Sequence, residues 1–344
     1  MPSRRSFLQA LSALGLATSL AAYSQPRPRF SSNPFKLGVA SGYPTPDGLT
    51  LWTRLAPEPA QPDGGLDPAP VPVRWEIARD ERFSSITASG TAEASPEWAH
   101  SVHVDVHGLE PDRWYWYRFM AGDAQSAPAR TRTAPAANAT VERLRFAFAS
   151  CQQYEQGYYG AYRHIVADEP DLVAFLGDYI YESSWGKDHV RKHDRPNEAL
   201  TLDDYRSRHA HYKTDPDLQA AHAACPWILT WDDHEVVNDY ADDRSIDGAM
   251  SKQEFLARRA AAYRAYYEHM PLPSRMRPEG ARMRIYTQVG WGALARFFVL
   301  DDRQYRSYHS CQPPGRRSAG SVDVSVCTKL LAPTRTILGR AQER

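Results

Sequence analysis

The sequence predicts two structural units in series, a β-sandwich over residues 35–133 and a layered α/β unit over residues 140–344. Short strand-like runs separated by Pro, Gly and Asp fill the first unit, whereas apolar strands alternate with helix-like segments in the second. A Pro/Ala/Asn-rich stretch at residues 132–142 lies between them and is typical of a linker. At 344 residues the chain is long enough to bury two cores.

The N-terminal segment has the pattern of an export signal. Arg4 and Arg5 precede a weakly apolar run that ends near Ala22. This run is too short and too rich in Ala, Ser and Gly to favour a transmembrane helix, so we expect no stable membrane span. Paired arginines before such a run are typical of a twin-arginine (Tat) signal, and the alternative is a basic tail before an amphipathic helix. We therefore expect residues 1–30 to be a signal peptide for the Tat machinery, and the protein to be periplasmic or secreted.

Charge and cysteine content narrow the functional classes. The 41 basic residues balance 41 acidic residues, so no overall field favours nucleic acid, and we expect no specific nucleic-acid binding. The chain contains four cysteines, Cys151, Cys225, Cys311 and Cys327. In an oxidising compartment Cys311 and Cys327 could form a disulfide, but the spacing alone leaves the pairing open.

The first unit reads as a β-sandwich of the immunoglobulin or fibronectin type. Five segments alternate or cluster apolar and β-branched residues between turn residues. They are "FKLGVAS", "GLTLWTRL", "VPVRWEIAR", "SVHVDVHGL" and "WYWYRFMAG". The stretch "GLEPDRWYWYRF" places Tyr115 and Tyr117 where a corner tyrosine enters a late strand of such a sandwich. We expect this unit to be accessory.

The second unit alternates strands and helices, which indicates an α/β fold. The expected order is a strand in "RLRFAFASC", a helix in "GYYGAYRHIVADE" and a strand in "PDLVAFLGD". A mixed polar region at residues 182–217 follows, and then a strand in "CPWILTWDDHE". The segment "SKQEFLARRAAAYRAYYEHM" predicts a long helix, and "IYTQVGWGALARFFVLDDRQYR" predicts a hairpin followed by a loop.

Each of the three apolar strands ends in residues that can bind a metal. Cys151 follows the first, Asp178 and Tyr181 follow the second, and Asp233 and His234 follow the third. Because the carboxyl ends of parallel strands meet at one edge of a sheet, these side chains are expected to converge. Thiolate, carboxylate and phenolate together suit ferric iron better than zinc or magnesium. The alternative is that Asp178 caps a turn and Tyr181 packs on the surface.

These segments resemble the PhoD family of alkaline phosphatases and phosphodiesterases, within the metallophosphatase superfamily. The resemblance rests on "GVASGYPTPDGLTLWTRL", "FAFASCQQYEQGYYGAYRHI", "DLVAFLGDYIYE", "WDDHEVVNDYA" and "LDDRQYR". It implies an immunoglobulin-like N-terminal domain and a calcineurin-like αββα catalytic domain with ferric iron and calcium as cofactors.

The resemblance also implies a ligand set and catalytic residues. Cys151, Asp178 and Tyr181 match the iron ligands, Asp178 is expected to bridge to calcium, and Asp233 is expected to bind calcium. His234 matches the donor to the phosphoryl oxygens, Asn238 could bind phosphate or metal, and Arg303 is a further candidate catalytic residue, with Asp232 and Asp302 as neighbours.

The implied activity is hydrolysis of phosphate mono- and diesters by a metal-activated hydroxide, without a covalent phospho-enzyme. Three alternatives stay open. One is a phospholipase-D-like phosphodiesterase on the same fold. Another is a purple-acid-type phosphatase, which shares the "GD-x-x-Y" spacing but gives no reason for Cys151. The third is a non-catalytic periplasmic binding module with a decayed second domain.

One family motif is absent from the sequence. A late "GDVH"-like stretch is expected in a metallophosphatase of this type, and the chain contains only "GKDHV" at residues 186–190. We therefore expect a catalytic domain truncated at its C-terminus, with exposed apolar surface and weak or no activity in this chain by itself. We also expect a monomer.

Overall fold

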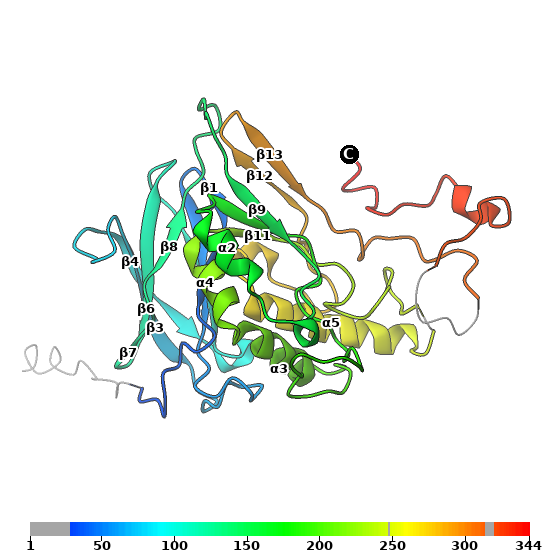
Figure 1. Cartoon of the computed structure of the whole chain (residues 1–344), viewed down its shortest axis with the longest axis horizontal. Helices are drawn as coiled ribbons and strands as arrows, with labels where there is room; N and C mark the ends of the chain where they lie inside the picture. Colours follow the sequence, from blue (N-terminus) through cyan, green and yellow to red (C-terminus); the bar gives the residue numbers. More distant parts are fainter. Residues whose placement is uncertain (1–27, 247, 314–319) are drawn as a thin grey trace, which may run out of the picture.

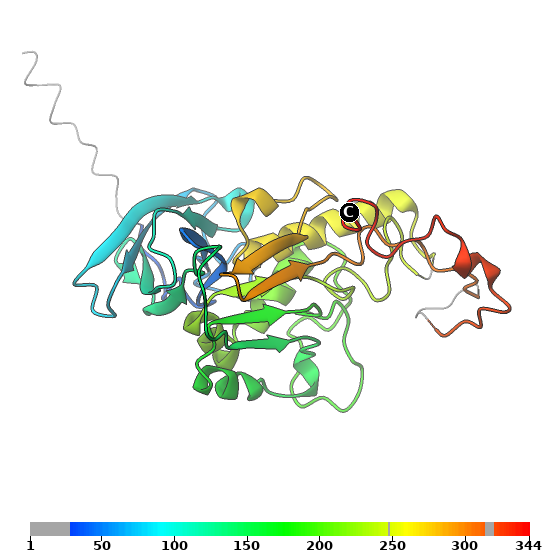
Figure 2. The same cartoon turned by 90° about the horizontal axis from the view of Figure 1, so that it is seen from above.

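The computed structural model describes residues 28–246, 248–313 and 320–344 (Figures 1 and 2). The predicted signal, residues 1–30, lies almost wholly outside the described residues. The β-rich region occupies one end of the molecule, and the C-terminal segment extends from the other end in both views. No helix among the described residues combines the length and the apolar character needed to cross a membrane.

The β-rich region contains eight strands and one short 3-10 helix within residues 39–132. These elements are β1 (Val39–Thr45), β2 (Gly48–Arg54), β3 (Val71–Ala78), β4 (Ile86–Ala94), η1 (Pro96–Trp98), β5 (Ser101–Val106), β6 (Trp114–Ala121), β7 (Ala124–Gln125) and β8 (Ala129–Arg132). Strands β4, β3, β6 and β7 form one sheet in that order, and β8 pairs with β6. The five predicted strands are present, while β4, β7 and β8 lie outside the predicted runs.

The hydrophobic core of this region is formed by apolar side chains that its strands direct inward. Leu51 on β2, Val73 on β3 and Phe119 on β6 are fully buried in one apolar cluster. Successive residues of a strand point to opposite faces, so alternate residues such as Val73, Trp75 and Ile77 on β3 share one face. Tyr115 is also fully buried, and its hydroxyl accepts a hydrogen bond from the backbone N–H of Glu110 at 2.9 Å. The tyrosine therefore ties the entry of β6 to the preceding turn.

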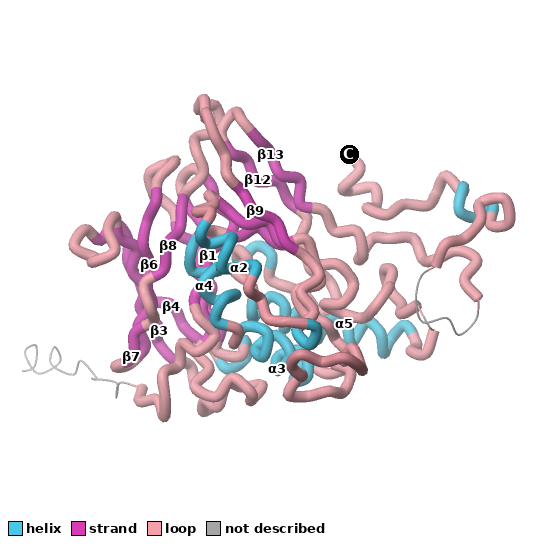
Figure 3. Tube along the Cα trace, in the orientation of Figure 1, coloured by secondary structure: helices cyan, strands magenta, loops and turns pink. Residues whose placement is uncertain are grey.

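The α/β region follows the predicted alternation closely (Figure 3). Its elements are β9 (Phe146–Ala149), η2 (Tyr154–Gln156), α2 (Ala161–Ala167), β10 (Leu172–Phe175), α3 (Leu202–Lys213), α4 (Pro216–Ala224), β11 (Trp227–Leu229), α5 (Lys252–His269), η3 (Ser274–Met276), β12 (Thr287–Trp291), β13 (Ala295–Val299) and η4 (Thr328–Leu331). Strands β9 and β11 both pair in parallel with β10, which lies between them. All four residues of β10 are buried, as expected for a strand covered on both faces.

A single six-stranded sheet joins the two regions. Its order is β5-β2-β1-β11-β10-β9, and β1 pairs in parallel with β11 through Gly42 and Trp227. The sequence suggested two units separated by a linker, whereas the β1–β11 pair makes their sheets continuous. A side chain at Gly42 would collide with this contact, because a Cβ there would lie 2.4 Å from the carbonyl oxygen of Pro271.

Helix α5 is defined by its cap and by one buried face. Ser251 accepts from the backbone N–H of Glu254, and the Glu254 carboxylate accepts from the N–H of Ser251, which is a capping box. Phe255, Ala262 and Tyr266 are buried from this helix. Helix α5 packs against α3, and α2 packs against α4.

Exposed apolar side chains lie on β9, directly after β10 and on β13. Phe148 on β9, Leu176 after β10 and Phe298 on β13 are between 51% and 68% exposed. A groove of about 460 Å³ lies between the ends of β10 and β11 and strand β13. Beyond the hairpin, Cys311 and Cys327 form a disulfide, while Cys151 and Cys225 are free thiols.

Candidate metal centre

The ends of β9 and β10 are held in register past the last residue of each strand. The N–H of Cys151 donates to the carbonyl of Gly177, and the N–H of Gln152 donates to that of Asp178, both at 3.1 Å. Cys151 and Asp178 adopt left-handed backbone conformations, with φ of 55° and 58°. Such conformations are uncommon for residues other than glycine and concentrate at functional sites.

Gly177 brings the end of β10 against the end of β11. Its φ is +108°, and a Cβ at this position would lie 2.3 Å from the backbone nitrogen of Asp232. Only glycine permits both the conformation and this close approach. The loop after β10 and the loop after β11 are therefore packed directly together.

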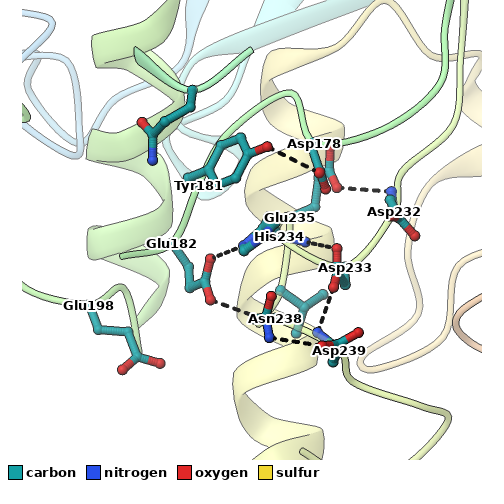
Figure 4. A network of polar contacts seen from close by, with 12 residues as sticks. Asp178, Tyr181, Glu182, Glu198, Asp232, Asp233, His234, Glu235, Asn238 and Asp239 are labelled. Atoms are coloured by element: carbon teal, nitrogen blue, oxygen red, sulfur yellow. Dashed lines mark hydrogen bonds and ion pairs between the residues drawn. The ribbon is translucent and has the colours of Figure 1, made fainter. Parts of the chain in front are cut away.

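Cys151, Asp178 and Tyr181 lie in contact. The Cys151 Sγ is 3.4 Å from Asp178 Oδ2, and the Tyr181 hydroxyl donates to the same oxygen at 3.2 Å. Figure 4 shows the Tyr181 ring directed at this carboxylate. Burial, the Asp178 charge and the neighbouring Cys151 raise the pKa of Tyr181, and burial is the main reason that the pKa of Cys151 is raised.

Asp178, Asp233 and His234 each offer one ligand atom, and these atoms lie within 4.8 Å of one another. The second oxygen of Asp178, Oδ1, is buried and has no hydrogen-bond partner among the described residues. Burial, and then the charge of Asp233, raise the pKa of Asp178 to about 6. A buried carboxylate with an unpaired oxygen beside a second carboxylate is costly unless a cation meets it. The carboxylates of Asp178 and Asp233 therefore fit a metal ion.

His234 is held by a buried carboxylate. Its Nδ1 lies 2.7 Å from Glu182 Oε2, and Glu182 is only 2% exposed. Burial alone would lower the pKa of His234, but Glu182, Asp233 and Asp178 raise it to about 9. Burial likewise opposes ionisation of Glu182, yet the bond to His234 leaves its pKa lowered. The pair is thus an imidazolium and a carboxylate at neutral pH.

Asn238 and Asp239 lie beside Asp233 in the same network (Figure 4), and Arg303 forms ion pairs with Asp233 and Asp239. Arg303 Nε donates to Asp232 at 2.5 Å, and its Nη2 lies 3.6 Å from Asp233. The backbone N–H of Asn238 donates to Glu182 at 2.9 Å, and the Asn238 amide donates to Asp239 at 3.1 Å. Asp302 follows along the same segment as Arg303, where it pairs with Arg306 at 3.2 Å.

The structure thus brings the sequence-predicted site residues to one edge of the sheet. It also adds three acids that sequence reasoning missed, namely Glu182, Glu235 and Asp239. Glu235 is fully buried and accepts from the N–H groups of Tyr179 and Asp232, at 2.6 Å and 3.0 Å, across the two loops. Glu182 directly follows Tyr181 in the sequence. This adjacency to a predicted metal ligand could have identified Glu182 as a residue of the site.

Comparisons with known proteins identify the family of the chain. Residues 146–344 match the PhoD-like phosphatase family, and residues 19–135 match its N-terminal domain. Alkaline phosphatase D of Bacillus subtilis (strain 168) is 48% identical over 360 aligned positions, which cover 99% of this chain and 59% of that protein. The solved structure of PhoD superposes with a TM-score of 0.84 at 48% identity, over 92% of this chain and 59% of the other.

The chain therefore belongs to the PhoD-like phosphatase family. It spans 59% of the length of each of these two relatives.

Proposed function

We propose that this chain carries the metal site of an alkaline phosphatase of the PhoD type, which hydrolyses phosphate mono- and diesters. The observation that supports this most strongly is the convergence of Cys151, Asp178, Tyr181, Asp233 and His234 from the ends of β9, β10 and β11. Family membership and the 48% identity to an alkaline phosphatase D support the same conclusion. The relatives are longer than this chain, so their activity is assigned to it only as a proposal.

The proposed cofactors are ferric iron and calcium. Cys151, Asp178 and Tyr181 would hold the iron, because a thiolate and a phenolate favour a strongly Lewis-acidic ion. Asp178 would bridge to the calcium, and Asp233 would be a calcium ligand. When bound, the cations supply positive charge that neutralises the phosphate ester and lowers the pKa of water.

The remaining residues would bind and orient the phosphoryl group. The contact with Glu182 raises the pKa of His234, and the protonated imidazole can donate a hydrogen bond to a phosphoryl oxygen. Glu182 fixes the orientation of this imidazole through Nδ1 and leaves Nε2 to act as the donor. Arg303 would contribute charge beside Asp233, and the Asn238 amide would contribute a further donor.

The proposed function also implies a fold for each region and a cellular location. The β-rich region would be an immunoglobulin-like domain, and the α/β region would be part of a calcineurin-like αββα domain. The Arg4–Arg5 pattern supports Tat export and a periplasmic or secreted location. We propose that the protein is a monomer.

Metal content tests the proposal most directly. The purified chain is expected to contain iron and calcium in stoichiometric amounts, measured by inductively coupled plasma mass spectrometry. Iron bound to Tyr181 should also give a visible charge-transfer absorption band. Asp178→Ala should abolish this band and the bound iron, whereas Asp203→Ala, on the exposed first turn of α3, should leave both unchanged. Hydrolysis of p-nitrophenyl phosphate and of bis(p-nitrophenyl) phosphate provides the activity readout.

Two results would contradict the proposal. Retention of iron by Asp178→Ala would remove Asp178 as a ligand. A purified chain that binds neither iron nor calcium would instead favour a non-catalytic binding module.

A further inference from the structure

A second charged site lies outside the acidic cluster. A cavity of about 490 Å³ is formed by the N-terminal half of α5, by η3 and the segment after it, and by residues 304–305. Its lining includes five arginines, Arg259, Arg275, Arg277, Arg282 and Arg284, but only two acids, Asp242 and Glu279. The lining therefore carries a net formal charge of +3, obtained as five minus two, in a chain whose net charge is zero.

The backbone places four of these arginines on the surface. Met276 is buried between Arg275 and Arg277, and the backbone of Glu279 pairs with that of Arg282 in a tight turn. Buried Met283 separates Arg282 from Arg284 in the same way. Alternation in the extended stretch after the turn exposes Arg282 and Arg284, whereas Arg275 and Arg277 lie in and directly after η3 and are exposed on either side of buried Met276.

Carboxylates do not neutralise these four arginines. Within residues 28–246, 248–313 and 320–344, no ion pair involves Arg275, Arg277, Arg282 or Arg284. Arg277 stacks on Trp98 with its guanidinium carbon 3.9 Å from the ring centre, and Arg284 lies 4.8 Å from the ring of Tyr286. Stacking holds the face of a guanidinium while leaving its N–H edge available for an anion.

The floor of the cavity is rigid. Arg259 on α5 is buried, and it donates to the backbone carbonyls of Ala281 and Asp242. Gln304 is also buried and exchanges hydrogen bonds with the backbone of Met283. Arg303, the residue before Gln304, belongs to the acidic cluster, so one short segment contributes to both sites.

We propose that this arginine cavity is an anion-binding site, separate from the acidic cluster, for a ligand that carries two or more phosphate groups. The planar fork of arginine matches phosphate oxygens bidentately, which explains the choice of arginine at all five basic positions. A single phosphate would engage about two such forks and would leave the other guanidinium groups unpaired. The volume of about 490 Å³ is within the range of small-ligand sites. The proposal does not depend on the hydrolytic function.

Isothermal titration calorimetry with fructose 1,6-bisphosphate tests the proposal. The titration uses the 344-residue chain with Asp178→Asn, so that the probe is not turned over at the acidic cluster. Saturable binding is expected, and adding Arg282→Gln with Arg284→Gln should weaken it at least about tenfold. The charge-matched pair Arg82→Gln with Arg143→Gln, exposed and outside the cavity, should change it by less than about twofold. Fructose 6-phosphate should bind more weakly than the bisphosphate.

The proposal is overturned if the bisphosphate shows no saturable binding, or if the Arg282/Arg284 variant binds as tightly as the control pair. Equal affinity for the mono- and bisphosphate would refute the requirement for two phosphate groups. Thermal melting verifies that the variants are folded, and Arg277→Gln replaces the double variant if the turn is disrupted. The Arg277→Gln variant must then show the weakened binding.

Discussion

Single residues at the strand ends set the geometry of the acidic cluster. Two groups of residues contact or approach the Asp178 carboxylate. Cys151 and Tyr181 contact its Oδ2 atom, and Asp233 and His234 approach it from the loop after β11. This convergence depends on how closely the two loops approach each other. Gly177 is the residue that permits that approach.

Replacing Gly177 by alanine is expected to disrupt the metal site. The added Cβ would lie 2.3 Å from the Asp232 nitrogen, so the two loops must separate. Displacing groups that orient metal ligands commonly weakens metal affinity by about 10- to 100-fold. We expect a loss of that size for Gly177→Ala, measured by equilibrium dialysis against radioactive iron and calcium.

Gly186→Ala is the matched control for this change. Gly186 also has a positive φ, of 82°, but nothing lies within 4 Å of the point that an added Cβ would occupy. The substitution therefore carries only the backbone cost of about 1–2 kcal/mol. If both variants lose metal equally, backbone strain rather than the collision with Asp232 explains the effect.

At the scale of whole elements, hydrophobic pattern predicted most of the fold. The strands β9, β10 and β11 and the helix α5 were found where apolar runs and a helix-like segment indicated them. Strand β4 was missed because its sequence, "ITASGTAEA", is small and polar, and most of its residues are exposed or partly exposed. An edge strand of this kind gives a weak periodic signal.

Long-range pairing could not be read from local pattern. Nothing in the sequence around Gly42 indicates a partner near residue 227, and the β1–β11 pair therefore came only from the structure. The same limit applies to the site. The motif spacing placed Asp178, Tyr181 and Asp233 at strand ends, but the Glu182–His234 contact depends on how the two loops fold.

Substitution of Tyr43 tests how much the pairing of β1 with β11 contributes to stability. Its buried hydroxyl donates to the carbonyl of Leu229 at 2.6 Å and accepts from the N–H of the same residue at 3.3 Å. Tyr43→Phe leaves both backbone groups without this hydroxyl, at an expected cost of about 1–3 kcal/mol in the free energy of unfolding. Urea denaturation measures this loss, and hydrogen exchange should show faster exchange of the Leu229 amide.

Tyr158→Phe provides the control, because Tyr158 is 73% exposed. It should leave both the unfolding midpoint and the Leu229 exchange rate unchanged. If the Leu229 amide exchanges as slowly in Tyr43→Phe as in the native chain, the pairing of β1 with β11 does not depend on this hydroxyl.

On the scale of the whole molecule, the zero net charge conceals a strongly uneven distribution. Acids gather at the metal centre, and arginines gather around the cavity beside α5. A third group of basic side chains is buried where α3 meets the β-rich region. Lys213 on α3 is 2% exposed, with its Nζ 4.3 Å from the Trp52 ring centre.

Buried basic residues surround this lysine. His209, on the same helix as Lys213, is fully buried, and neither of its ring nitrogens has a hydrogen-bond partner among the residues that the structure describes. Arg54 and His269 are fully buried and lie 2.7 Å apart between Nη1 and Nε2, and His222 is nearly fully buried. Burial lowers the pKa of each of the three histidines well below its usual value. These histidines remain neutral at physiological pH, so Arg54 and Lys213 are the cations that burial penalises.

Lys213 is expected to make the free energy of unfolding rise with pH above neutrality, opposite in sign to the contribution of His234, whose pKa is raised to about 9. Burial lowers the pKa of Lys213 to about 7, whereas an unfolded lysine keeps its proton up to a pH of about 10.4. Between these values the unfolded chain binds more protons than the folded chain, so the free energy of unfolding increases with pH by at most about 1.4 kcal/mol per pH unit. Lys213→Met should remove this slope and stabilise the protein at pH 7. Urea denaturation between pH 7 and about 9.5 measures the slope, with the exposed Lys187→Met as control. Because His234 contributes equally to both proteins, the test is the difference between their slopes, and equal slopes in Lys213→Met and the native chain would mean that Lys213 makes no such contribution.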